Sequence, residues 1–324
     1  MIKTETMVAK PFLKWAGGKG QLLSQLDKYL PQQLDGRHFT YIEPFVGGGA
    51  MLFHMLNEHP EITHAVINDI NSHLVTAYRV IKERPKELVE QLADLEKQYY
   101  ALNNEDAKRD YFLRARDIFN EEQLDDIDRS RYLIFLNRTC FNGLYRENSN
   151  GKFNVPFGKY LNPTICNKET IMADSELLNR ANVTILNGDF EETLNYMDLN
   201  GMNMFYFDPP YRPLNSTSSF NSYVKEAFND DEQIRLRDFS QKINSRLGVY
   251  WMLSNSDCSA NNPEDTFFEN IYRDFYINRV FASRSINADP NKRGKLTELL
   301  ICNYPPEGYG KFAAEERTPY NNAI

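Results

Sequence analysis

An aspartate, two prolines and a tyrosine follow an apolar, aromatic run in the second half of the chain. The run occupies residues 203–207, and Asp208-Pro209-Pro210-Tyr211 comes directly after it. Proline has no backbone N–H to donate to a neighbouring strand, so we expect a strand to end at this point. Asp208 and Tyr211 would then lie at the carboxyl edge of a sheet, where open α/β folds bind their ligands. The alternative for this stretch alone is an ordinary strand followed by a proline turn.

Two glycine-rich stretches near the N-terminus could let a ligand approach the backbone closely. The first, at residues 14–19, has the sequence Lys-Trp-Ala-Gly-Gly-Lys, and leucines at helical spacing follow it. It lacks the Gly-Lys-Ser/Thr ending of a P-loop, which disfavours phosphate binding. The second, at residues 41–50, is typical of a strand, a glycine turn and the start of a helix. It predicts the first βα unit of a Rossmann-like sheet, although it differs from the strict G-x-G-x-x-G of nicotinamide enzymes.

An acid at the end of the next predicted strand could bind a ribose. Asp69 follows a short apolar strand at residues 65–68 and lies twenty residues after Gly49. That spacing suits a carboxylate that accepts hydrogen bonds from ribose hydroxyls. Asp69 could instead cap a helix, although Asn71 or Ser72 would serve equally well.

A second acid, Asp189, follows a predicted strand at residues 183–186. Its carboxylate could accept a hydrogen bond from an adenine amino group, and Phe190 could cover the ring. The alternative is an acid in a turn beside a phenylalanine of the core.

Strand signals vanish between residues 72 and 137, where helical periodicity takes over. We expect three helices, the first opened by Pro85, whose apolar stripes form core. The stripes are Leu88, Leu92, Leu95 and Tyr99, then Phe112, Ala115 and Phe119, then Tyr132, Leu133 and Leu136. A helical block between the second and third strands of a sheet is an insertion, and therefore a candidate second domain.

The insertion ends in a basic stretch, at residues 137–160, that is rich in aromatic and amide side chains. Asn150-Gly151 is a strong signal for the turn of a β-hairpin between two short strands. Between residues 131 and 160, Glu147 is the single acid among five basic residues, which are Arg131, Arg138, Arg146, Lys152 and Lys159. The guanidinium of an arginine can form two hydrogen bonds with guanine, and an apolar side chain can insert between neighbouring base pairs. The stretch therefore suits recognition of bases in a DNA groove. The alternative is a solvated basic hairpin.

The rest of the chain supplies the remaining elements of the sheet. A polar loop at residues 212–223 is a candidate lid beside the Asp208 motif. The pattern predicts a helix over 230–244 and strands over 248–255, 276–281 and 296–304. Residues 305–324 resemble a polar, poorly ordered tail.

Composition limits the class of protein. A chain of 324 residues with 25% charged and 41% hydrophobic residues is globular and can bury a sizeable core. No apolar run approaches the ~18 residues of a membrane span, and the N-terminus lacks the apolar block of a signal peptide. Four scattered cysteines without a Cys-x-x-Cys pair favour a reducing cytoplasm and disfavour disulfides or a zinc site. The net charge of −8 weakly opposes nucleic-acid binding, but the net charge of the whole chain does not exclude a local basic patch.

These blocks together, in this order, resemble a known family. Lys-Trp-Ala-Gly-Gly-Lys precedes Glu-Pro-Phe-Val-Gly-Gly-Gly-Ala, and Asn-Asp, Phe-Asn-Gly-Leu-Tyr-Arg and Asp-Pro-Pro-Tyr follow. The chain resembles the Dam family of DNA adenine-N6 methyltransferases, which includes restriction-system and orphan members that modify GATC. The resemblance extends over residues 12–304 and is specific, since unrelated Rossmann enzymes would not share all the blocks in this order.

The resemblance implies S-adenosylmethionine as the cofactor and double-stranded DNA as the partner, with neither a metal nor a membrane. It also allows a cognate restriction endonuclease that acts on the same site without being a stable subunit. The implied catalytic residues are Asp208, Pro209 and Tyr211. The implied cofactor-binding residues are Trp15, Lys19, Glu43, Phe45, Gly47, Asp69, Asp189, Phe190 and Asp208. The implied DNA-binding residues are Lys14, Arg138, Phe141, Asn142, Leu144, Arg146, Pro156 and Lys159.

Two of the implied DNA contacts have distinct expected roles. Phe141 falls at the position of the family's intercalating aromatic residue. Lys159 stands where relatives often have arginine, and it lacks the planar fork of that residue. We therefore expect Lys159 to hold a phosphate or a single acceptor.

The implied reaction agrees with the chemistry of the motif. An adenine amine is a poor nucleophile because its lone pair is delocalised into the ring, and the base must leave the duplex to be reached. The Asp208 carboxylate and the Pro209 carbonyl could accept hydrogen bonds from both amine protons. These hydrogen bonds would localise the lone pair toward the methyl group. Tyr211 could stack on the flipped base, a contact of roughly 1–3 kcal/mol in comparable sites. Asp208 cannot usefully deprotonate a neutral aryl amine first, so we expect the proton to leave after methyl transfer.

The expected fold is α/β. It comprises a Rossmann-like methyltransferase sheet and an inserted, mainly helical DNA-recognition domain that carries a β-hairpin. We expect a discontinuous catalytic and cofactor-binding domain at residues 1–72 and 164–306. A target-recognition domain would occupy residues 73–163, and a C-terminal tail would occupy residues 307–324.

Other functions remain as alternatives. Methylation of cytosine N4 or of an RNA amine is close in chemistry, but Asp rather than Ser before Pro-Pro favours adenine, and the hairpin favours duplex DNA. A nicotinamide oxidoreductase is disfavoured by the missing G-x-G-x-x-G. A DNA-binding regulator built on an inactive methyltransferase is disfavoured by the intact motif at residues 208–211.

Overall fold

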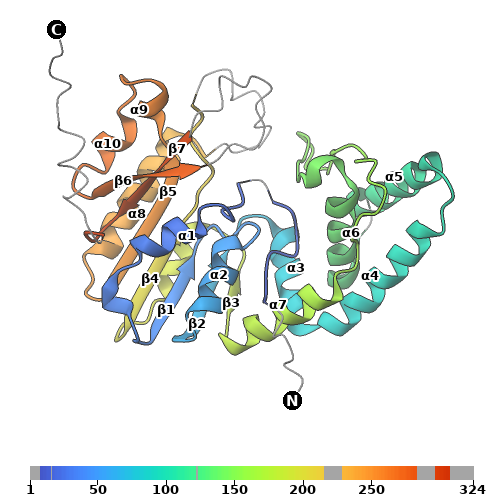
Figure 1. Cartoon of the computed structure of the whole chain (residues 1–324), viewed down its shortest axis with the longest axis horizontal. Coiled ribbons are helices and arrows are strands. Elements are labelled where there is room, and N and C mark those ends of the chain that lie inside the picture. The colour runs from blue at the N-terminus through green and yellow to red at the C-terminus, as the bar shows by residue number, and fades with distance from the viewer. Residues whose placement is uncertain (1–7, 16, 122, 215–227, 283–295, 307–324) are drawn as a thin grey trace, which may run out of the picture.

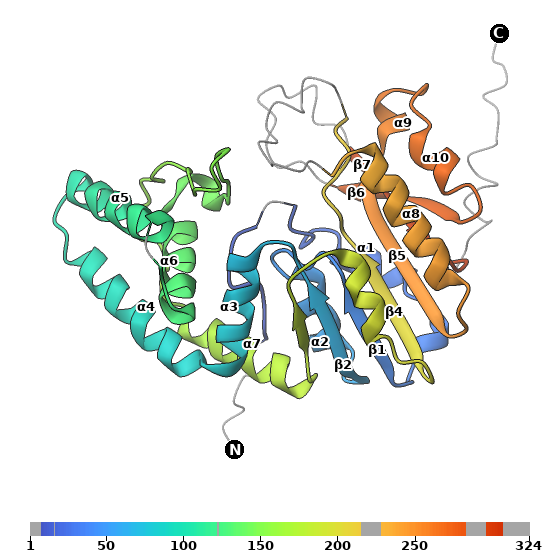
Figure 2. The same cartoon turned by 180° about the vertical axis from the view of Figure 1, so that it is seen from behind.

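The computed structural model describes residues 8–15, 17–121, 123–214, 228–282 and 296–306. They form a seven-stranded sheet with helices on both faces and a group of helices beside one edge (Figures 1 and 2). The strands are β1 (Phe39–Glu43), β2 (Ile62–Asn68), β3 (Thr184–Leu186), β4 (Met202–Phe207), β5 (Val249–Ser256), β6 (Tyr276–Ala282) and β7 (Leu296–Cys302). The helices are α1 (Leu23–Leu26), α2 (Ala50–Glu58), α3 (Ser72–Glu83), α4 (Pro85–Tyr100), α5 (Glu105–Glu121), α6 (Asp126–Thr139), α7 (Lys168–Arg180), α8 (Asp230–Asn244), α9 (Cys258–Asn261) and α10 (Phe267–Ile271). Short 3-10 helices are η1 (Asp27–Tyr29), η2 (Gln32–Leu34), η3 (Phe141–Gly143) and η4 (Phe190–Tyr196).

The strand order β3-β2-β1-β4-β5-β7-β6 determines where a ligand can bind. The strands from β3 to β5 pair in parallel, whereas β7 pairs antiparallel with both β5 and β6. The neighbours β1 and β4 lead into helices on opposite faces, since α2 packs in one core and α8 in the other. Open α/β sheets bind ligands outside the carboxyl ends of strands at such a switch point. The ends of β1 and β4 are therefore the favoured site, and the predicted α/β sheet is confirmed.

The residues of β4 show how the two faces are covered. Met204 and Tyr206 pack in the core that contains α2 and α7, whereas Phe205 and Phe207 pack in the core that contains α8. All four side chains are fully buried. A strand that is apolar at every position is typical of a parallel sheet covered on both faces. The strand ends at Phe207, as the following prolines predict.

Helices α4, α5 and α6 lie beside the β3 edge of the sheet, and α3 connects them to it (Figure 1). Helix α3 packs against both α6 and α7. The predicted stripes of α4 and α5 are buried, and in α6 Leu133 and Leu136 are buried while Tyr132 is half-buried. Pro85 opens α4 as predicted, and the Asp125 side chain caps α6. The extent of a separate recognition domain stays a prediction.

The chain after α6 forms the predicted hairpin, but without regular strands. The N–H of Asn148 donates to the carbonyl of Lys152 at 2.9 Å, and Glu147 and Phe153 form an isolated bridge. The turn uses Gly151, whose φ is 72°. The side chain of Asn120, in α5, binds both the N–H and the carbonyl of Phe153 at 2.8 and 3.0 Å. Glu147 and Phe153 form a non-hydrogen-bonded pair, so these groups of Phe153 point away from Glu147 and α5 holds the outer edge of the second arm.

Two predicted segments lie outside the described residues. They are the part of the candidate lid beyond residue 214 and the tail from residue 307. Among the described helices, none combines the length and the apolar character needed to cross a membrane.

Candidate active site

Asp208 lies directly after β4, beside a lysine from the first glycine-rich stretch. Its Oδ1 is 3.0 Å from the Nζ of Lys19. That Nζ donates to the hydroxyl of Tyr211, which in turn donates to Oε2 of Glu298, both at 2.6 Å. The Nζ of Lys19 also lies 3.4 Å from Glu298. One buried cation thus joins two carboxylates and a phenol in a hydrogen-bonded group, named here the Asp208 cluster.

The charges in this cluster set the protonation of Asp208. Burial raises the pKa of Asp208 to about 6, while the Lys19 ammonium opposes that rise and Glu298 adds to it. At neutral pH the carboxylate is therefore mostly ionised and can accept hydrogen bonds. Burial, reinforced by Asp208, holds the pKa of Tyr211 well above its ordinary value, so its ring stays neutral. The Lys19 Nζ lies 4.2 Å from the centre of that ring, toward its hydroxyl end.

The glycine turn after β1 is tied to the end of β2. The N–H of Gly47 donates to one oxygen of Asp69 at 3.0 Å, and the N–H of Asn71 donates to the other at 2.9 Å. Asn71 caps α3, so the alternative role of Asp69 as the helix cap is wrong. Gly49 has a φ of 74°, and a Cβ there would collide with the hydroxyl of Tyr78. Burial raises the pKa of Asp69, and the backbone donors oppose that rise.

Glu43 ends β1 and is buried inside the sheet edge. Burial holds its pKa well above the ordinary value, although the hydroxyl of Tyr41, which donates to it at 2.8 Å, opposes this effect. Phe45, two residues on, packs against Phe190 with ring centres 5.3 Å apart.

Trp15 lies between the glycine turn and the hairpin. A Cβ at Gly47 or Gly48 would contact the Trp15 side chain, so glycine is needed for this close packing. The Trp15 ring also stacks on Tyr145, with centres 5.2 Å apart and planes 24° from parallel. The residue predicted to bind the cofactor therefore contacts the stretch predicted to bind DNA.

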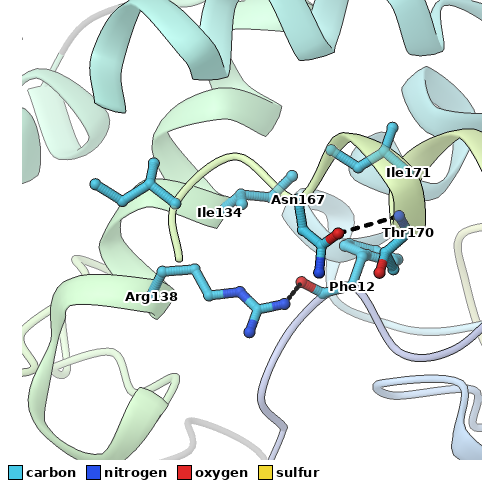
Figure 3. Close-up of a pocket in the computed structure, with 7 residues that line it drawn as sticks. Phe12, Ile134, Arg138, Asn167, Thr170 and Ile171 are labelled. Atoms are coloured by element: carbon cyan, nitrogen blue, oxygen red, sulfur yellow. Dashed lines mark hydrogen bonds between the residues drawn. The ribbon is translucent and has the colours of Figure 1, made fainter. Parts of the chain in front are cut away.

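Two residues at the end of α6 hold the N-terminal stretch in place. The N–H of Lys14 donates to Oδ1 of the buried Asn137 at 2.9 Å, and Nδ2 of Asn137 donates to the carbonyls of Lys14 and Gly143 at 2.8 Å. Arg138 donates to the carbonyl of Phe12 at 2.6 Å (Figure 3). Burial lowers the pKa of the Arg138 guanidinium. Arg138, predicted to bind DNA, thus has a partner inside the protein.

Asp189 and Phe190 share an arginine that the sequence did not indicate. The Nη2 of Arg235 lies 2.7 Å from the carboxylate of Asp189, and its guanidinium lies 4.3 Å over the ring of Phe190. The same arginine holds the pKa of Asp189 below its ordinary value. Phe190 is buried, as its alternative role in the core predicts. The carboxylate is ionised and beside an aromatic ring.

Phe141, the predicted wedge, and Leu144, another predicted DNA contact, are exposed at the surface. Phe141 is 51% exposed and Leu144 is 36% exposed. Asn142 lies between them with a φ of 55°, a left-handed conformation that turns the chain sharply. Pro156 is exposed nearby, and its carbonyl accepts from the N–H of Phe141 at 2.8 Å. An apolar projection is thus available to a partner.

The basic residues of the hairpin are paired within the protein. Nε of Arg146 donates to the side chain of Asn154 at 2.7 Å, which orients the guanidinium on the exposed arm. Lys159 lies 2.7 Å from Glu105, with both side chains exposed. Such exposed ion pairs are weak and can be exchanged for a phosphate.

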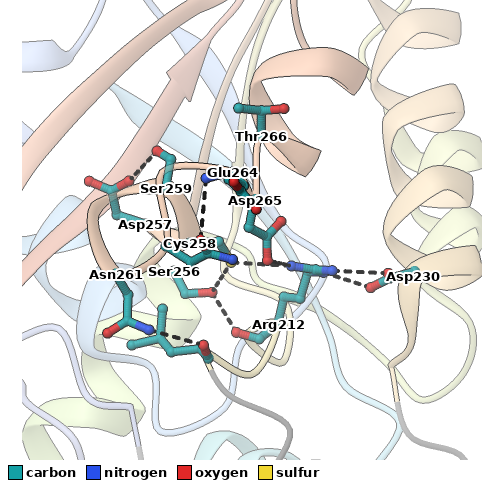
Figure 4. Close-up of polar contacts among 12 residues, drawn as sticks. Arg212, Asp230, Ser256, Asp257, Cys258, Ser259, Asn261, Glu264, Asp265 and Thr266 are labelled. Carbon is teal, nitrogen blue, oxygen red and sulfur yellow. Dashed lines mark hydrogen bonds and ion pairs between the residues drawn. The ribbon is translucent and has the colours of Figure 1, made fainter.

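Arg212 anchors the chain just after the Asp208 motif (Figure 4). Its guanidinium lies 2.8 Å from Asp230, at the start of α8, and 2.6 Å from Asp265. Its carbonyl accepts from the hydroxyl of Ser256 at 2.5 Å. These contacts fix the backbone next to Tyr211.

The sequence prediction missed Glu298, Arg235 and Arg212. A signal existed for Glu298, because it is the single charged residue in the apolar strand β7. Nothing in the local pattern distinguishes Arg235 from other exposed helical arginines. In the described part of the chain, no group of three or more His, Cys, Asp or Glu side chains is placed to hold a metal ion.

Comparison with known proteins adds independent evidence. A family model described as D12 class N6 adenine-specific DNA methyltransferase matches residues 15–286. A type II methyltransferase of Methanocaldococcus jannaschii, M.MjaIII, is 46% identical over 92% of this chain and 100% of its own length. The type II methyltransferase M1.LlaDCHI of Lactococcus lactis is 38% identical over 91% of this chain and 95% of its own. A DNA adenine methylase of Vibrio cholerae is 31% identical over 91% of this chain and 96% of its own.

Proposed function

Because this chain belongs to the D12 class of N6 adenine-specific DNA methyltransferases, we propose that it methylates an adenine flipped out of duplex DNA within GATC. The observation that carries the proposal is Asp208 at the end of β4, bonded to Lys19 and next to the neutral ring of Tyr211. Flipping is required because the N6 amine is not accessible to such a site inside the stacked duplex. The relatives named DNA adenine methylase support GATC as the target.

The Asp208 cluster can bind and orient an adenine amine. The ionised carboxylate of Asp208 accepts a hydrogen bond from one N–H of N6, and the Pro209 carbonyl accepts a hydrogen bond from the other. These two hydrogen bonds localise the lone pair on the nitrogen. Lys19 holds the hydroxyl of Tyr211, and the neutral ring offers a surface on which the base stacks. The extra proton leaves N6 after methylation, and the Asp208 carboxylate is the nearest group able to receive it.

The residues around the glycine turn fit S-adenosylmethionine, the methyl donor implied by the family. Gly47 and Gly48 let the Trp15 side chain pack closely on the turn, and Asp69 presents a carboxylate beside it. We assign cofactor binding to this turn together with Trp15, Lys19, Glu43, Phe45, Asp189, Phe190 and Asp208. When bound, the cofactor supplies an electrophilic methyl group. Asp189 would have to share its oxygens between the cofactor and Arg235.

The hairpin and the N-terminal stretch supply the proposed DNA contacts. Phe141 and Leu144 are apolar and exposed, as a wedge between base pairs requires. Arg146 is held on the exposed arm by Asn154 with a fork that matches guanine. We assign DNA binding to these residues and to Lys14, Arg138, Asn142, Pro156 and Lys159, within a recognition domain at residues 73–163. The catalytic and cofactor-binding domain would then occupy residues 1–72 and 164–306.

A role in restriction and modification follows from the relatives. Two of them are named type II methyltransferases. We infer that this chain protects its target sites from a cognate endonuclease that recognises the same sequence without binding the methyltransferase stably.

The test is long-read mapping of N6-methyladenine in a methylation-free host that expresses this chain. We expect the modified base at GATC in the host that expresses the wild type and none in a matched host that expresses Asp208→Ala. Modification at a different sequence would contradict the GATC assignment, and modified cytosine would contradict the assigned reaction.

A further inference from the structure

Glu298 occupies an unusual position for an acid. It lies on β7, the antiparallel strand between β5 and β6, opposite Ser256 on one side and Val280 on the other. Its side chain is only 16% exposed, and every other residue of this strand is uncharged. Placing a carboxylate at such a site is unfavourable unless it is paired and hydrogen-bonded. The partners it finds are Tyr211 and Lys19 of the Asp208 cluster.

We propose that Glu298 is a positioning residue for methyl transfer, which fixes the Tyr211 hydroxyl and shares the Lys19 ammonium with Asp208. The proposal rests on the proposed function of the same site. Glu298 lies ninety residues after Asp208 in the sequence and on a strand that runs in the opposite direction.

The first part of the argument concerns the orientation of Tyr211. Its hydroxyl accepts from Lys19 and donates to Glu298, both at 2.6 Å, so both of its hydrogen-bonding functions are used. Without Glu298 the O–H proton is left with Asp208 as its acceptor in the cluster, and the ring loses one of its anchors. A stacking ring must be held in one plane to select a base in one orientation.

The second part concerns charge. Lys19 contributes one positive charge, whereas Asp208 and Glu298 contribute two negative charges when ionised. The cluster therefore carries one excess negative charge beside the amine that becomes positive on methylation. Electrostatic stabilisation of developing charge in a partly buried site is a major part of catalysis. Without Glu298, Lys19 would neutralise Asp208 and this excess would vanish.

The third part concerns Asp208 itself. The groups that act on it from the packed elements are Lys19, Glu298, Tyr211 and, less directly, Tyr206 and Glu43. Lys19 stabilises the carboxylate, whereas the charge of Glu298 raises the pKa of Asp208. Removing that charge must therefore lower the pKa of Asp208, which no purely mechanical role of Glu298 would do.

The geometry sets a lower bound on this decrease in the pKa of Asp208. The interacting oxygens of Asp208 and Glu298 lie 3.0 and 3.4 Å from the same nitrogen, so they are at most 3.0 + 3.4 = 6.4 Å apart. Coulomb's law at that distance in the dielectric constant of water gives about half a pKa unit. A lower effective dielectric constant gives more.

The test is a titration of Asp208 by carbon-13 NMR of labelled carboxylates, with Asp208→Asn used to assign the signal. We expect Glu298→Gln to lower the midpoint by about half a unit or more. The matched control is Glu269→Gln, because Glu269 is also paired, at 2.9 Å from Arg279, but lies outside the Asp208 cluster. The control should leave the midpoint unchanged. An unchanged or raised midpoint in Glu298→Gln would overturn the proposal. This titration needs neither DNA nor cofactor, so its result is independent of whether the wild type methylates adenine.

A second measurement separates positioning from charge. Transfer of tritiated methyl groups to adenine-unmethylated plasmid DNA is followed above pH 8, where Asp208 is ionised in all variants. We expect Glu298→Ala to lower kcat about tenfold or more, the effect of one lost charged hydrogen bond, with a smaller change in KM. Glu298→Gln should recover part of kcat relative to Glu298→Ala, because its amide oxygen can still accept from Tyr211 although the negative charge is lost. Wild-type kcat in Glu298→Ala would refute the positioning role, whereas an inactive wild type would refute the proposed function instead.

Discussion

Replacing Lys19 with methionine should shift the pH dependence of methylation upward. The methionine side chain has a similar length but no charge, so Asp208 loses the cation 3.0 Å from its carboxylate. Coulomb's law at this distance gives about 1.4 kcal/mol in the dielectric constant of water and about 5.5 kcal/mol at an effective constant of 20. These energies correspond to about 1 to 4 pKa units. The pKa of Asp208 should therefore rise from about 6 to about 7 or higher.

The direction of this change in the pH dependence follows because Asp208 must be ionised to accept a hydrogen bond from the amine. Activity requires ionised Asp208 and falls as the pH decreases through its pKa. With a shift of one unit, the ionised fraction at pH 6 falls from about one half to about one tenth, a loss of about fivefold. The loss should disappear above pH 9 if the shift is near this lower limit.

The assay is kcat against pH from 5 to 10 at saturating S-adenosylmethionine and DNA, which separates protonation from any loss of cofactor affinity. Lys19→Arg retains the charge, so its kcat should fall at nearly the same acidic pH as that of the wild type. Lys28→Met is the matched control, since Lys28 is an exposed lysine of the same N-terminal segment. If kcat of Lys19→Met falls at the same acidic pH as kcat of the wild type, then Lys19 does not set the protonation of Asp208 and the reasoning is refuted.

Four further predictions concern other parts of the molecule. Asn137→Ala should lower the free energy of unfolding by about 2–3 kcal/mol in urea titrations, because backbone groups of Lys14 lose their buried partners; an unchanged midpoint would show that this junction contributes nothing. Burial raises the pKa of Asp174 to about 8, so the contribution of this group to stability should fall as the pH rises from 4 to 8, where the unfolded state is already ionised. Asp174→Asn should remove this contribution to the slope and gain up to about 5 kcal/mol relative to wild type at pH 8, and parallel stability curves would contradict the shift. Arg146→Ala should cost about 1–3 kcal/mol on the cognate site and relax preference at one base pair, whereas equal weakening on random duplexes would indicate a phosphate contact. Phe141→Ala should weaken base extrusion, seen as a reduced 2-aminopurine signal at the target adenine, and leave site preference largely unchanged.

Local features of the sequence predicted the elements that carry the site. The end of β4 at Phe207 follows from the two prolines, whose missing N–H groups act only on their immediate neighbours. The helix over Asp230–Asn244 and the buried stripe of α4 follow from helical spacing in the same way. Such predictions succeed because strand and helix periods are set within a few residues.

The contacts across the site could not be predicted, because they join segments far apart in the chain. Lys19 and Asp208 lie 3.0 Å apart at the end of β4, although 189 residues separate them in the sequence. The hairpin is present without regular strands, and Asn120 of another helix binds the backbone of Phe153. A side-chain contact of this kind leaves no trace in the periodicity of either segment.

The most direct test of the central claim is the rate of methyl transfer by Asp208→Ala. The variant should retain its fold, shown by an unchanged circular dichroism spectrum, and lose more than about a hundredfold in kcat, or about 2.7 kcal/mol. Asp208→Asn should also be severely impaired, because a neutral amide is a weaker acceptor and brings a competing donor. Asp238→Ala, which removes an exposed acid of α8, should keep wild-type kcat. Folded Asp208→Ala protein that keeps more than about a hundredth of the wild-type kcat would show that this carboxylate does not hold the adenine amine.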